Sequence, residues 1–430
     1  MTSALLTDRY ELTMIDAALR DGRGMRHGVF ELFARRLPSG RRFGVVAGTG
    51  RLLEQLQEFR FGHDELAWLR THRVVHDDTL DWLEAYRFSG TIRGYREGEL
   101  YFPGSPVLVV EGGFAEAVIL ETLALSIFNY DSAIASAAAR MVSAADGRPL
   151  AEMGSRRTGE RSAVAAARAA YIAGFGATSN LEAGRTWGIP TMGTAAHAFT
   201  LLYETEEEAF RAQVAAMGVG TTLLVDTYDI ERGVETAVRV AGTDLGAVRI
   251  DSGDLAPTVA AVRKQLDALG ATRTRITVTN DLDEHAIASL RAAPVDAYGV
   301  GTSLVTGSGA PASGMVYKLV AHVDDDGTWH SVGKKSDGKA TVGGRKQAVR
   351  TLSHGVATAE TIYVDDPQVV PDAGRGLIVP LVDGGHVDAA HLGADGVGAA
   401  REHHAKAIAE MPLEAFSLGR GEPAIPTRYV

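Results

Sequence analysis

The feature that most constrains the fold is a repeat between residues 174 and 304, in which short apolar runs alternate with helical stretches. The runs are GIPTMGT, TTLLVDT, GAVRIDSGD, RITVTND and VDAYGVGT, and amphipathic segments such as APTVAAVRKQLDALG lie between them. Strands that alternate with helices of this length are typical of βα units around a parallel sheet. The regular spacing favours an α/β barrel, whose chemistry is carried by the loops after the strands.

The chain on either side of this repeat has a different pattern. The first third mixes helical segments with short β runs, and β-like pieces replace the helices after residue 309. We predict an N-terminal α+β lobe over residues 1–115 and the barrel, with the active-site mouth, over 116–310. The remaining β segments and a closing helix, over 311–430, are expected to pack on the N-terminal lobe and make one discontinuous lobe.

Composition narrows the class of protein. A formal charge of −11 disfavours nucleic-acid binding, because such domains usually carry a basic stripe. The chain has no cysteine, which excludes disulfides and thiolate metal sites. The start of the chain lacks the pattern of a signal peptide. Charged and polar residues interrupt the apolar stretch 114–145, which favours a buried helix over a membrane span. We therefore expect a cytoplasmic protein.

Polar residues follow each expected strand of the repeat. Because the carboxyl ends of parallel strands meet at one mouth, these side chains are expected to converge there. Glycines and hydroxyls suit a phosphate, and carboxylates suit ribose hydroxyls or a magnesium ion. Each residue alone is about as well explained as a helix cap. The set comprises Ser179, Asn180, Gly193, Thr194, His197, Asp226, Thr227, Asp251, Ser252, Asp254, Asn280, Asp281, Gly301 and Thr302.

Three local patterns suggest particular chemistry. GVGTSLVTG, at 299–307, is the strongest phosphate candidate, although a plain strand-to-helix turn has the same pattern. His197 follows small residues, and a nucleophilic histidine would need orientation by a carboxylate such as Asp226 or Asp251. The segment EMGSRRTGE, at 152–160, offers arginines, which suit planar or anionic ligands.

Lysine is unevenly distributed. The chain has seven lysines, and five of them are Lys318, Lys334, Lys335, Lys339 and Lys346. A solvated surface loop explains such a run most simply. The functional alternative is a mobile basic flap over a polyanionic substrate.

The order of several segments resembles the nicotinate phosphoribosyltransferase family from residue 5 to about residue 350. The segments are LLTDRYELTM (5–14), FELFARRLPSGRRFGVVAG (30–48), MGSRRTGE (153–160), ATSN (177–180), GTAAHAF (193–199), LLVDTYD (223–229), VRIDSGDL (248–255), TNDLDE (279–284), GVGTSLVT (299–306), VYKLV (316–320) and GRKQAVR (344–350).

The resemblance implies an ATP-assisted enzyme with an irregular α/β barrel of the type II phosphoribosyltransferase kind. Nicotinate would displace pyrophosphate from C1 of 5-phosphoribosyl 1-pyrophosphate, giving nicotinate mononucleotide in the first step of NAD salvage from nicotinate. His197 matches the histidine that ATP phosphorylates transiently. Magnesium would accompany the pyrophosphate and ATP, and no protein ligand for the metal is assigned. The family works as a homodimer with shared sites.

The resemblance also implies roles for individual residues. Tyr10 would stack on the pyridine ring in a partner's pocket, with Arg156 near the opposite face. Arg249 would bind the nicotinate carboxylate, Asp251 would lie near the ribose, and Gly301 with Thr302 near the 5′-phosphate. Arg35, Lys318 and the 334–346 flap would contact the pyrophosphate. Thr194 and Ser252 would contact the substrate at the mouth of the barrel. Related enzymes often have an aromatic residue at Met153.

Three alternatives stay open. Nicotinamide phosphoribosyltransferase typically uses an aspartate to accept from the amide, where this chain has Ser179. A serine hydroxyl and Arg249 suit a carboxylate better. Quinolinate phosphoribosyltransferase is usually much shorter and lacks the segment 5–14. A barrel isomerase or aldolase would need a catalytic lysine or an acid–base pair, and the barrel region offers only Lys264, in an expected helix.

Overall fold

The structure is a computed structural model, which describes residues 4–334, 341–365 and 374–430. The chain divides into two compact units. One is built from both ends of the chain, Met1–Ser136 and Ala310–Val430, and the other from the segment between them, Ala137–Gly309. The three-part division expected from the sequence stays a prediction. The two units are described separately.

The second unit contains a six-stranded sheet in which every pair of neighbouring strands is parallel. The strand order is β7-β6-β11-β10-β9-β8. The strands are β6 (Leu150–Glu152), β7 (Ala177–Thr178), β8 (Thr222–Leu224), β9 (Ala247–Ile250), β10 (Arg275–Val278) and β11 (Ala297–Val300).

Most neighbouring strands in this sheet are also neighbours in the chain. Each strand from β8 to β11 pairs with the next, and β11 then pairs with β6, the first strand of the set. Among the described residues no pair joins β7 to β8, and a parallel bridge between Thr178 and Thr191 extends the β7 edge instead. The expected α/β class with a parallel sheet is therefore confirmed as a half-barrel. The complete type II barrel stays a prediction.

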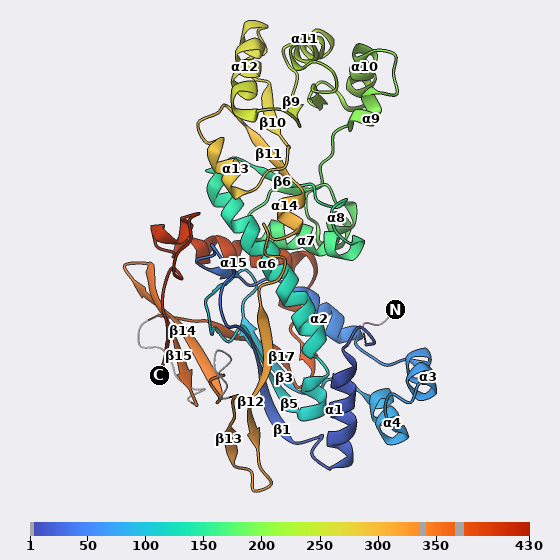
Figure 1. Cartoon of the computed structure of the whole chain (residues 1–430), viewed down its shortest axis with the longest axis vertical. Coiled ribbons are helices and arrows are strands. Elements are labelled where there is room, and N and C mark those ends of the chain that lie inside the picture. The colour runs from blue at the N-terminus through green and yellow to red at the C-terminus, as the bar shows by residue number, and fades with distance from the viewer. Residues whose placement is uncertain (1–3, 335–340, 366–373) are drawn as a thin grey trace. The chain divides into compact units, whose positions relative to one another are not determined.

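Helices follow the strands, as the repeat in the sequence requires. They are α7 (Glu160–Ile172), α8 (Leu181–Trp187), α9 (His197–Thr200), α10 (Glu206–Met217), α11 (Ile230–Ala241), α12 (Leu255–Ala268), α13 (Glu284–Ser289) and α14 (Thr302–Val305). Side chains at the strand ends begin several of them: Asn180 caps α8 and Asp229 caps α11. Helices α10, α11 and α12 pack side by side in chain order (Figure 1).

The first unit is built around a seven-stranded antiparallel sheet with the order β13-β12-β1-β5-β3-β17-β18. Its strands are β1 (His27–Ala34), β3 (Thr91–Tyr95), β5 (Leu108–Gly113), β12 (Met315–Val323), β13 (Trp329–Ser331), β17 (Ile378–Asp383) and β18 (His386–Val387). Two smaller sheets contain β2 (Gly44–Val45) with β4 (Leu100–Tyr101), and β14 (Lys346–Ser353) with β15 (Val356–Val364), β16 (Arg375–Gly376) and β19 (Thr427–Tyr429).

The helices of the first unit are α1 (Arg9–Arg20), α2 (Thr49–Glu58), α3 (His63–Thr71), α4 (Asp77–Ala85), α5 (Phe114–Val118) and α15 (Gly393–Ala409), with short 3-10 turns at Ala389–His391 and Leu413–Phe416. Helix α6 (Glu121–Ala145) continues from the first unit into the second. The stretch Phe114–Ala145 is long and apolar enough to cross a membrane, but most of its apolar part is buried inside the protein. It therefore has the character of a core helix, as expected.

Candidate active site

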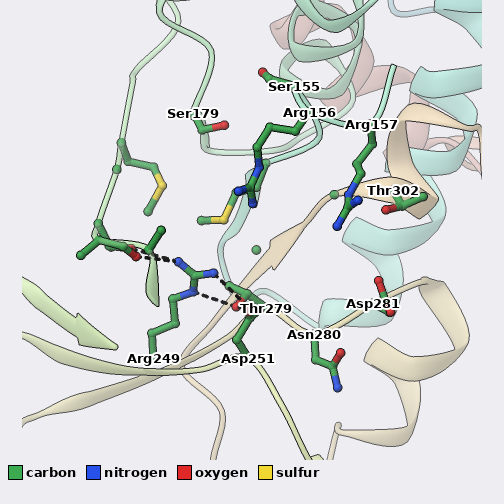
Figure 2. A pocket seen from close by; sticks show the side chains of 18 residues that line it. Ser155, Arg156, Arg157, Ser179, Arg249, Asp251, Thr279, Asn280, Asp281 and Thr302 are labelled. Carbon is green, nitrogen blue, oxygen red and sulfur yellow. Dashed lines mark hydrogen bonds and ion pairs between the residues drawn. The ribbon is translucent and has the colours of Figure 1, made fainter. Parts of the chain in front are cut away.

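A cavity of about 540 Å³ opens at the carboxyl ends of the parallel strands in the second unit. Its lining comes from the loops after β6, β7, β10 and β11, from β9 and from the segment before α9 (Figure 2). The lining residues are Met153, Ser155, Arg156, Arg157, Ser179, Met192, Gly193, Thr194, Ala195, Ala196, Arg249, Asp251, Thr279, Asn280, Asp281, Gly299, Gly301 and Thr302. Of the fourteen polar residues expected at this mouth, eight line the cavity, and Asn180, His197, Asp226, Thr227, Ser252 and Asp254 do not.

Arg249 is held in one position by several neighbours. Its Nε donates to the Thr279 hydroxyl at 2.8 Å, and its Nη1 donates to the Thr194 hydroxyl at 3.1 Å. Its Nη2 lies 3.4 Å from Asp251 Oδ2, and the side chain is 14% exposed. A guanidinium fixed in this way is preorganised to meet a planar anion, because little rotational freedom is left to lose.

The loop after β6 carries further positive charge into the cavity. The side chains of Arg156 and Arg157 extend from it, and Ser179 lies nearby on the loop after β7 (Figure 2). With Arg249, the lining holds three guanidinium groups against two carboxylates, Asp251 and Asp281. The surplus of positive charge favours an anionic ligand.

The end of β11 lies close to the loop after β6. A Cβ atom on Gly299 would stand 2.7 Å from the Met153 sulfur and 2.7 Å from Thr279 Cγ2, so only glycine leaves room for both. Gly301 and Thr302, the predicted phosphate contacts, follow directly and line the same cavity. Helix α14, which begins at Thr302, has only four residues.

His197 begins α9 beside the cavity. Its Nδ1 lies 3.1 Å from the Thr227 hydroxyl, and its Nε2 lies 3.8 Å from Asp226 Oδ1 and 4.0 Å from Asp251 Oδ2. The side chain is 41% exposed. Both carboxylates considered for its orientation thus face the same ring nitrogen, and the ring stays accessible to a ligand.

Asp226 is fully buried and organises the loop after β9. Its Oδ2 accepts from the Asp251 backbone N–H at 2.8 Å and from the Ser252 hydroxyl at 2.7 Å. Its Oδ1 has no hydrogen-bond partner in the described part of the chain. Burial, followed by the charges of Asp229 and Asp226, raises the pKa of nearby Glu206 to about 7. The Asp226 and Asp251 carboxylates thus place negative charge next to the His197 imidazole.

Three predicted site residues, Tyr10, Arg35 and Lys318, belong to the first unit. Tyr10 lies on α1 and is 47% exposed, and burial, followed by the charge of Glu121, raises its pKa. Lys318 Nζ lies 3.3 Å from Glu121 Oε1. The Arg35 guanidinium lies 5.9 Å from the centre of the Phe33 ring. Their roles stay predictions.

The expected basic flap needs one correction. Lys346 is not part of a solvated loop: it lies in β14, and its Nζ is 2.7 Å from Glu31 Oε2 with both side chains almost completely buried. Lys334 is exposed. Lys335 and Lys339 lie outside the described residues.

Sequence reasoning missed Thr279 and Met192 as residues of this cavity, whereas Arg157 belongs to the arginine-bearing segment 152–160 that it had singled out. The Thr279 hydroxyl donates to Asp251 Oδ1 at 2.5 Å while it accepts from Arg249, so it joins the two charged groups. In the sequence Thr279 belongs to a β-branched run and is indistinguishable from a strand residue. The signal that could have identified Thr279 is its position directly after β10, at the mouth where the other polar residues gather.

Comparisons with known proteins show which sequences the chain is similar to. Residues 5–129 match the model of the nicotinate phosphoribosyltransferase (NAPRTase) N-terminal domain. The chain is 58% identical over 438 aligned positions to a nicotinate phosphoribosyltransferase of Mycobacterium tuberculosis, covering 100% of this chain and 95% of the relative. A Bacillus subtilis nicotinate phosphoribosyltransferase is 39% identical over 84% of this chain and 76% of its own length.

The fold is also similar to solved structures. The crystal structure of human nicotinic acid phosphoribosyltransferase superposes with a TM-score of 0.83 at 25% identity, covering 98% of this chain and 97% of the human chain. A nicotinate-nucleotide pyrophosphorylase from Pyrococcus furiosus superposes with a TM-score of 0.76 at 22% identity, over 96% of both chains. The second likeness concerns the fold alone.

Proposed function

The chain belongs to the nicotinate phosphoribosyltransferase family, and from this premise we propose that it transfers phosphoribosyl to nicotinate in a reaction coupled to ATP through a phosphorylated His197. It is an enzyme of NAD biosynthesis, and its substrates are nicotinate and 5-phosphoribosyl 1-pyrophosphate. The observation that carries the assignment to this site is the cavity of three arginines and two carboxylates at the strand ends.

Nicotinate is a planar anion, and the cavity offers it matching groups. Arg249 pairs with the carboxylate, Arg156 lies over the pyridine ring, and the Ser179 hydroxyl donates a hydrogen bond. A guanidinium suits both tasks because it is a forked donor with a flat stacking face. Because Asp251 offsets part of the Arg249 charge, Arg156 and Arg157 supply the remaining attraction for the substrate.

In the transfer step, the pyridine nitrogen forms a bond to C1 of the ribose while the bond from C1 to the pyrophosphate oxygen breaks. Positive charge develops on the ribose ring, and Asp251 would stabilise it. Gly301 and Thr302 hold the 5′-phosphate, and Thr194 and Ser252 keep Arg249 and Asp226 in place. Preorganised charges of this kind stabilise a transition state without the reorganisation that water would need.

ATP would phosphorylate His197. An imidazole nitrogen attacks the γ-phosphorus, the P–O bond to ADP breaks, and the ring gains positive charge. Asp226 and Asp251, within about 4 Å of Nε2, stabilise that charge. Hydrolysis of the phosphohistidine would then drive product formation.

A magnesium ion would accompany pyrophosphate and ATP, where it neutralises the charge on the leaving group. Asp251 and Asp281 offer oxygen ligands of the type magnesium prefers. Among the described residues no three histidine or carboxylate side chains gather as a metal site. We therefore infer that substrate oxygens and water would complete the coordination.

We further propose a cytoplasmic homodimer with shared sites. Tyr10 would stack on the nicotinate ring in the partner's pocket, and Arg35, Lys318 and Lys334 would contact pyrophosphate. The partial exposure of Tyr10 and Lys318 supports these roles, because both side chains can reach a ligand.

Two other functions compete less well. A nicotinamide-using enzyme would need an acceptor for the amide, and Ser179 is a weaker acceptor than the aspartate expected there. A phosphosugar isomerase or aldolase would need a lysine or a paired acid and base, and none of the described lining residues is a lysine.

The direct test measures product formation by the purified enzyme with 5-phosphoribosyl 1-pyrophosphate and magnesium. Nicotinate or nicotinamide is offered, each with and without ATP. Nicotinate turnover stimulated by ATP is expected. Turnover of nicotinamide alone would show that the chain is a nicotinamide phosphoribosyltransferase. Nicotinate turnover that does not change with ATP would contradict the proposed coupling to ATP.

His197→Ala tests the phosphohistidine. We expect ATP hydrolysis to be lost while slow ATP-independent transfer to nicotinate continues, because the transfer step itself uses other residues. ADP release and nicotinate mononucleotide formation are measured in parallel. Equal loss of both would make His197 a structural residue.

A further inference from the structure

Glu152 is a buried carboxylate directly behind the cavity. It is the last residue of β6, it is 0% exposed, and it does not line the cavity itself. In the sheet it lies opposite Thr178, the last residue of β7. Two loops that line the cavity begin at these two residues: one carries Arg156 and the other carries Ser179.

Both carboxylate oxygens of Glu152 are used to hold these loops. One oxygen accepts from the backbone N–H of Gly154, in the loop that carries Arg156. The other accepts from the Thr178 hydroxyl at 2.5 Å. The backbone carbonyl of Glu152 also accepts from the Ser179 N–H at 2.8 Å. The residue therefore binds to both loops at their origins.

A second set of bonds closes the connection farther out. The Thr178 hydroxyl accepts from the Asn180 N–H at 2.9 Å, and Asn180 Nδ2 donates to the Ser155 hydroxyl at 3.0 Å. The two loops are thus joined at both their base and their middle. A network that satisfies all its members makes its geometry rigid.

The Gly154 turn has little freedom to take another position. A Cβ atom on Gly154 would lie 2.2 Å from Val305 Cγ1 and 3.0 Å from the Gly301 carbonyl oxygen, so the turn packs against the loop of the predicted phosphate contacts. Without the carboxylate, the buried Gly154 N–H would have to find another acceptor. Loss of a partner for a buried donor is costlier than the average hydrogen bond suggests.

We propose that Glu152 is a positioning residue that sets the distance between Arg156 and Ser179 and thereby the fit of the cavity to nicotinate. This inference rests on the proposed roles of those two residues. Glu152 itself touches no substrate, because protein groups occupy both of its oxygens. Its effect should therefore appear in nicotinate binding rather than in the transfer step.

The test compares Glu152→Ala with Glu152→Gln in steady-state kinetics. Alanine removes both side-chain bonds, and we expect the KM for nicotinate to rise about tenfold, with the KM for 5-phosphoribosyl 1-pyrophosphate and kcat changed less than about threefold. Glutamine keeps an oxygen for Gly154 and can donate to the Thr178 hydroxyl, so it should restore the KM for nicotinate. Glu160→Ala, an exposed change just beyond the same loop, is the matched control.

Thr178→Val provides a second route if Glu152→Ala fails to fold. It removes the hydroxyl that binds the Glu152 carboxylate and the Asn180 N–H while keeping the shape of the side chain, and it should also raise the KM for nicotinate. An unchanged KM in Glu152→Ala, an equal loss in Glu152→Gln, or a uniform fall in kcat would overturn the proposal. Wild-type enzyme that fails to use nicotinate would instead overturn the proposed function.

Discussion

At the scale of single residues, the cavity depends on hydroxyl groups that connect charged side chains. Thr194 and Thr279 hold Arg249, Ser252 and the Asp251 backbone hold Asp226, and the Thr227 hydroxyl faces His197. A hydroxyl can donate to a carboxylate and accept from a guanidinium at the same time. The orientation of the charged groups is therefore fixed by neutral neighbours.

Thr279→Val should remove the hydroxyl that binds both Arg249 and Asp251, with little change in the volume of the side chain. Because two hydrogen bonds to charged groups are lost, we expect kcat/KM for nicotinate to fall between about tenfold and a hundredfold. Thr279→Ser keeps the hydroxyl and should stay within about threefold of wild type. Steady-state kinetics measure both, and equal activity of the two variants would show that the hydroxyl is dispensable.

Lys346→Met tests the buried ion pair with Glu31. Methionine fills the space of the lysine stem but leaves a carboxylate without its partner, so we expect a loss of about 3–5 kcal/mol in the free energy of unfolding of the first unit. Lys346→Met combined with Glu31→Leu should recover much of the loss. Chemical denaturation measures all three, with the exposed Lys334→Met as control; a single variant as stable as wild type would contradict the prediction.

At the scale of elements, the half-barrel was accessible from the sequence because its signal is local. Each βα unit contains its own apolar run, its own cap and its own amphipathic helix, so the pattern predicts both the parallel sheet and the mouth at the strand ends. The role of Lys346 was not accessible. Its partner Glu31 lies on β1, 315 positions away in the chain, and no local pattern indicates which lysine of a basic run will be buried.

Thr279 shows a second limit of the same kind. The residue follows β10, and its partners are Arg249 in β9 and Asp251 directly after β9, so only the register of the strands brings the three together. By contrast, Ser179, Thr194, Asp251 and Thr302 line one cavity as the strand ends suggested. Strand order determines which of these neighbours meet, and strand order is a long-range property.

Gly299→Ala tests the close approach of β11 to the loop after β6. The added methyl would overlap both the Met153 sulfur and Thr279 Cγ2, so one of them must move within the cavity. We expect the KM for nicotinate to rise about tenfold. Gly398→Ala, on α15 with no atom near the added methyl, is the matched control. Kinetics unchanged by Gly299→Ala would mean that the cavity tolerates the shift.

At the scale of the whole molecule, the two ends of the chain build one unit and the middle builds the other. The lining of the cavity described above belongs to the middle segment. The first unit also buries polar groups, among them Glu11 on α1. Its carboxylate accepts from the Thr122 backbone N–H at 2.9 Å and from the hydroxyls of Thr7 and Thr122.

Titration of Glu11 should contribute to the pH dependence of stability. Burial raises its pKa from 4.5 to about 7, although the hydrogen bonds from Thr122 and Thr7 oppose the shift. A raised folded-state pKa means that its contribution to stability is complete below the unfolded value and is lost as the pH rises through about 7.

Glu11→Gln does not titrate at this position, so the advantage of wild type in Tm over Glu11→Gln should shrink between about pH 5 and about pH 8. Thermal unfolding across that range measures the difference. Glu58→Gln, an exposed change at the end of α2, should show a constant difference. If the difference in Tm between wild type and Glu11→Gln is also constant across this pH range, Glu11 is not a source of the pH dependence.

The pairing of β1 with β12 has a consequence for how the protein is made on the ribosome. Roughly 280 residues separate the end of β1 from the start of β12, and at about 5–20 residues per second their synthesis takes between a quarter of a minute and one minute. During that interval one edge of β1 lacks its native neighbour and can pair with other chains. Nascent chains that stop before residue 323 should therefore aggregate, and they should depend more on chaperones than the finished protein does.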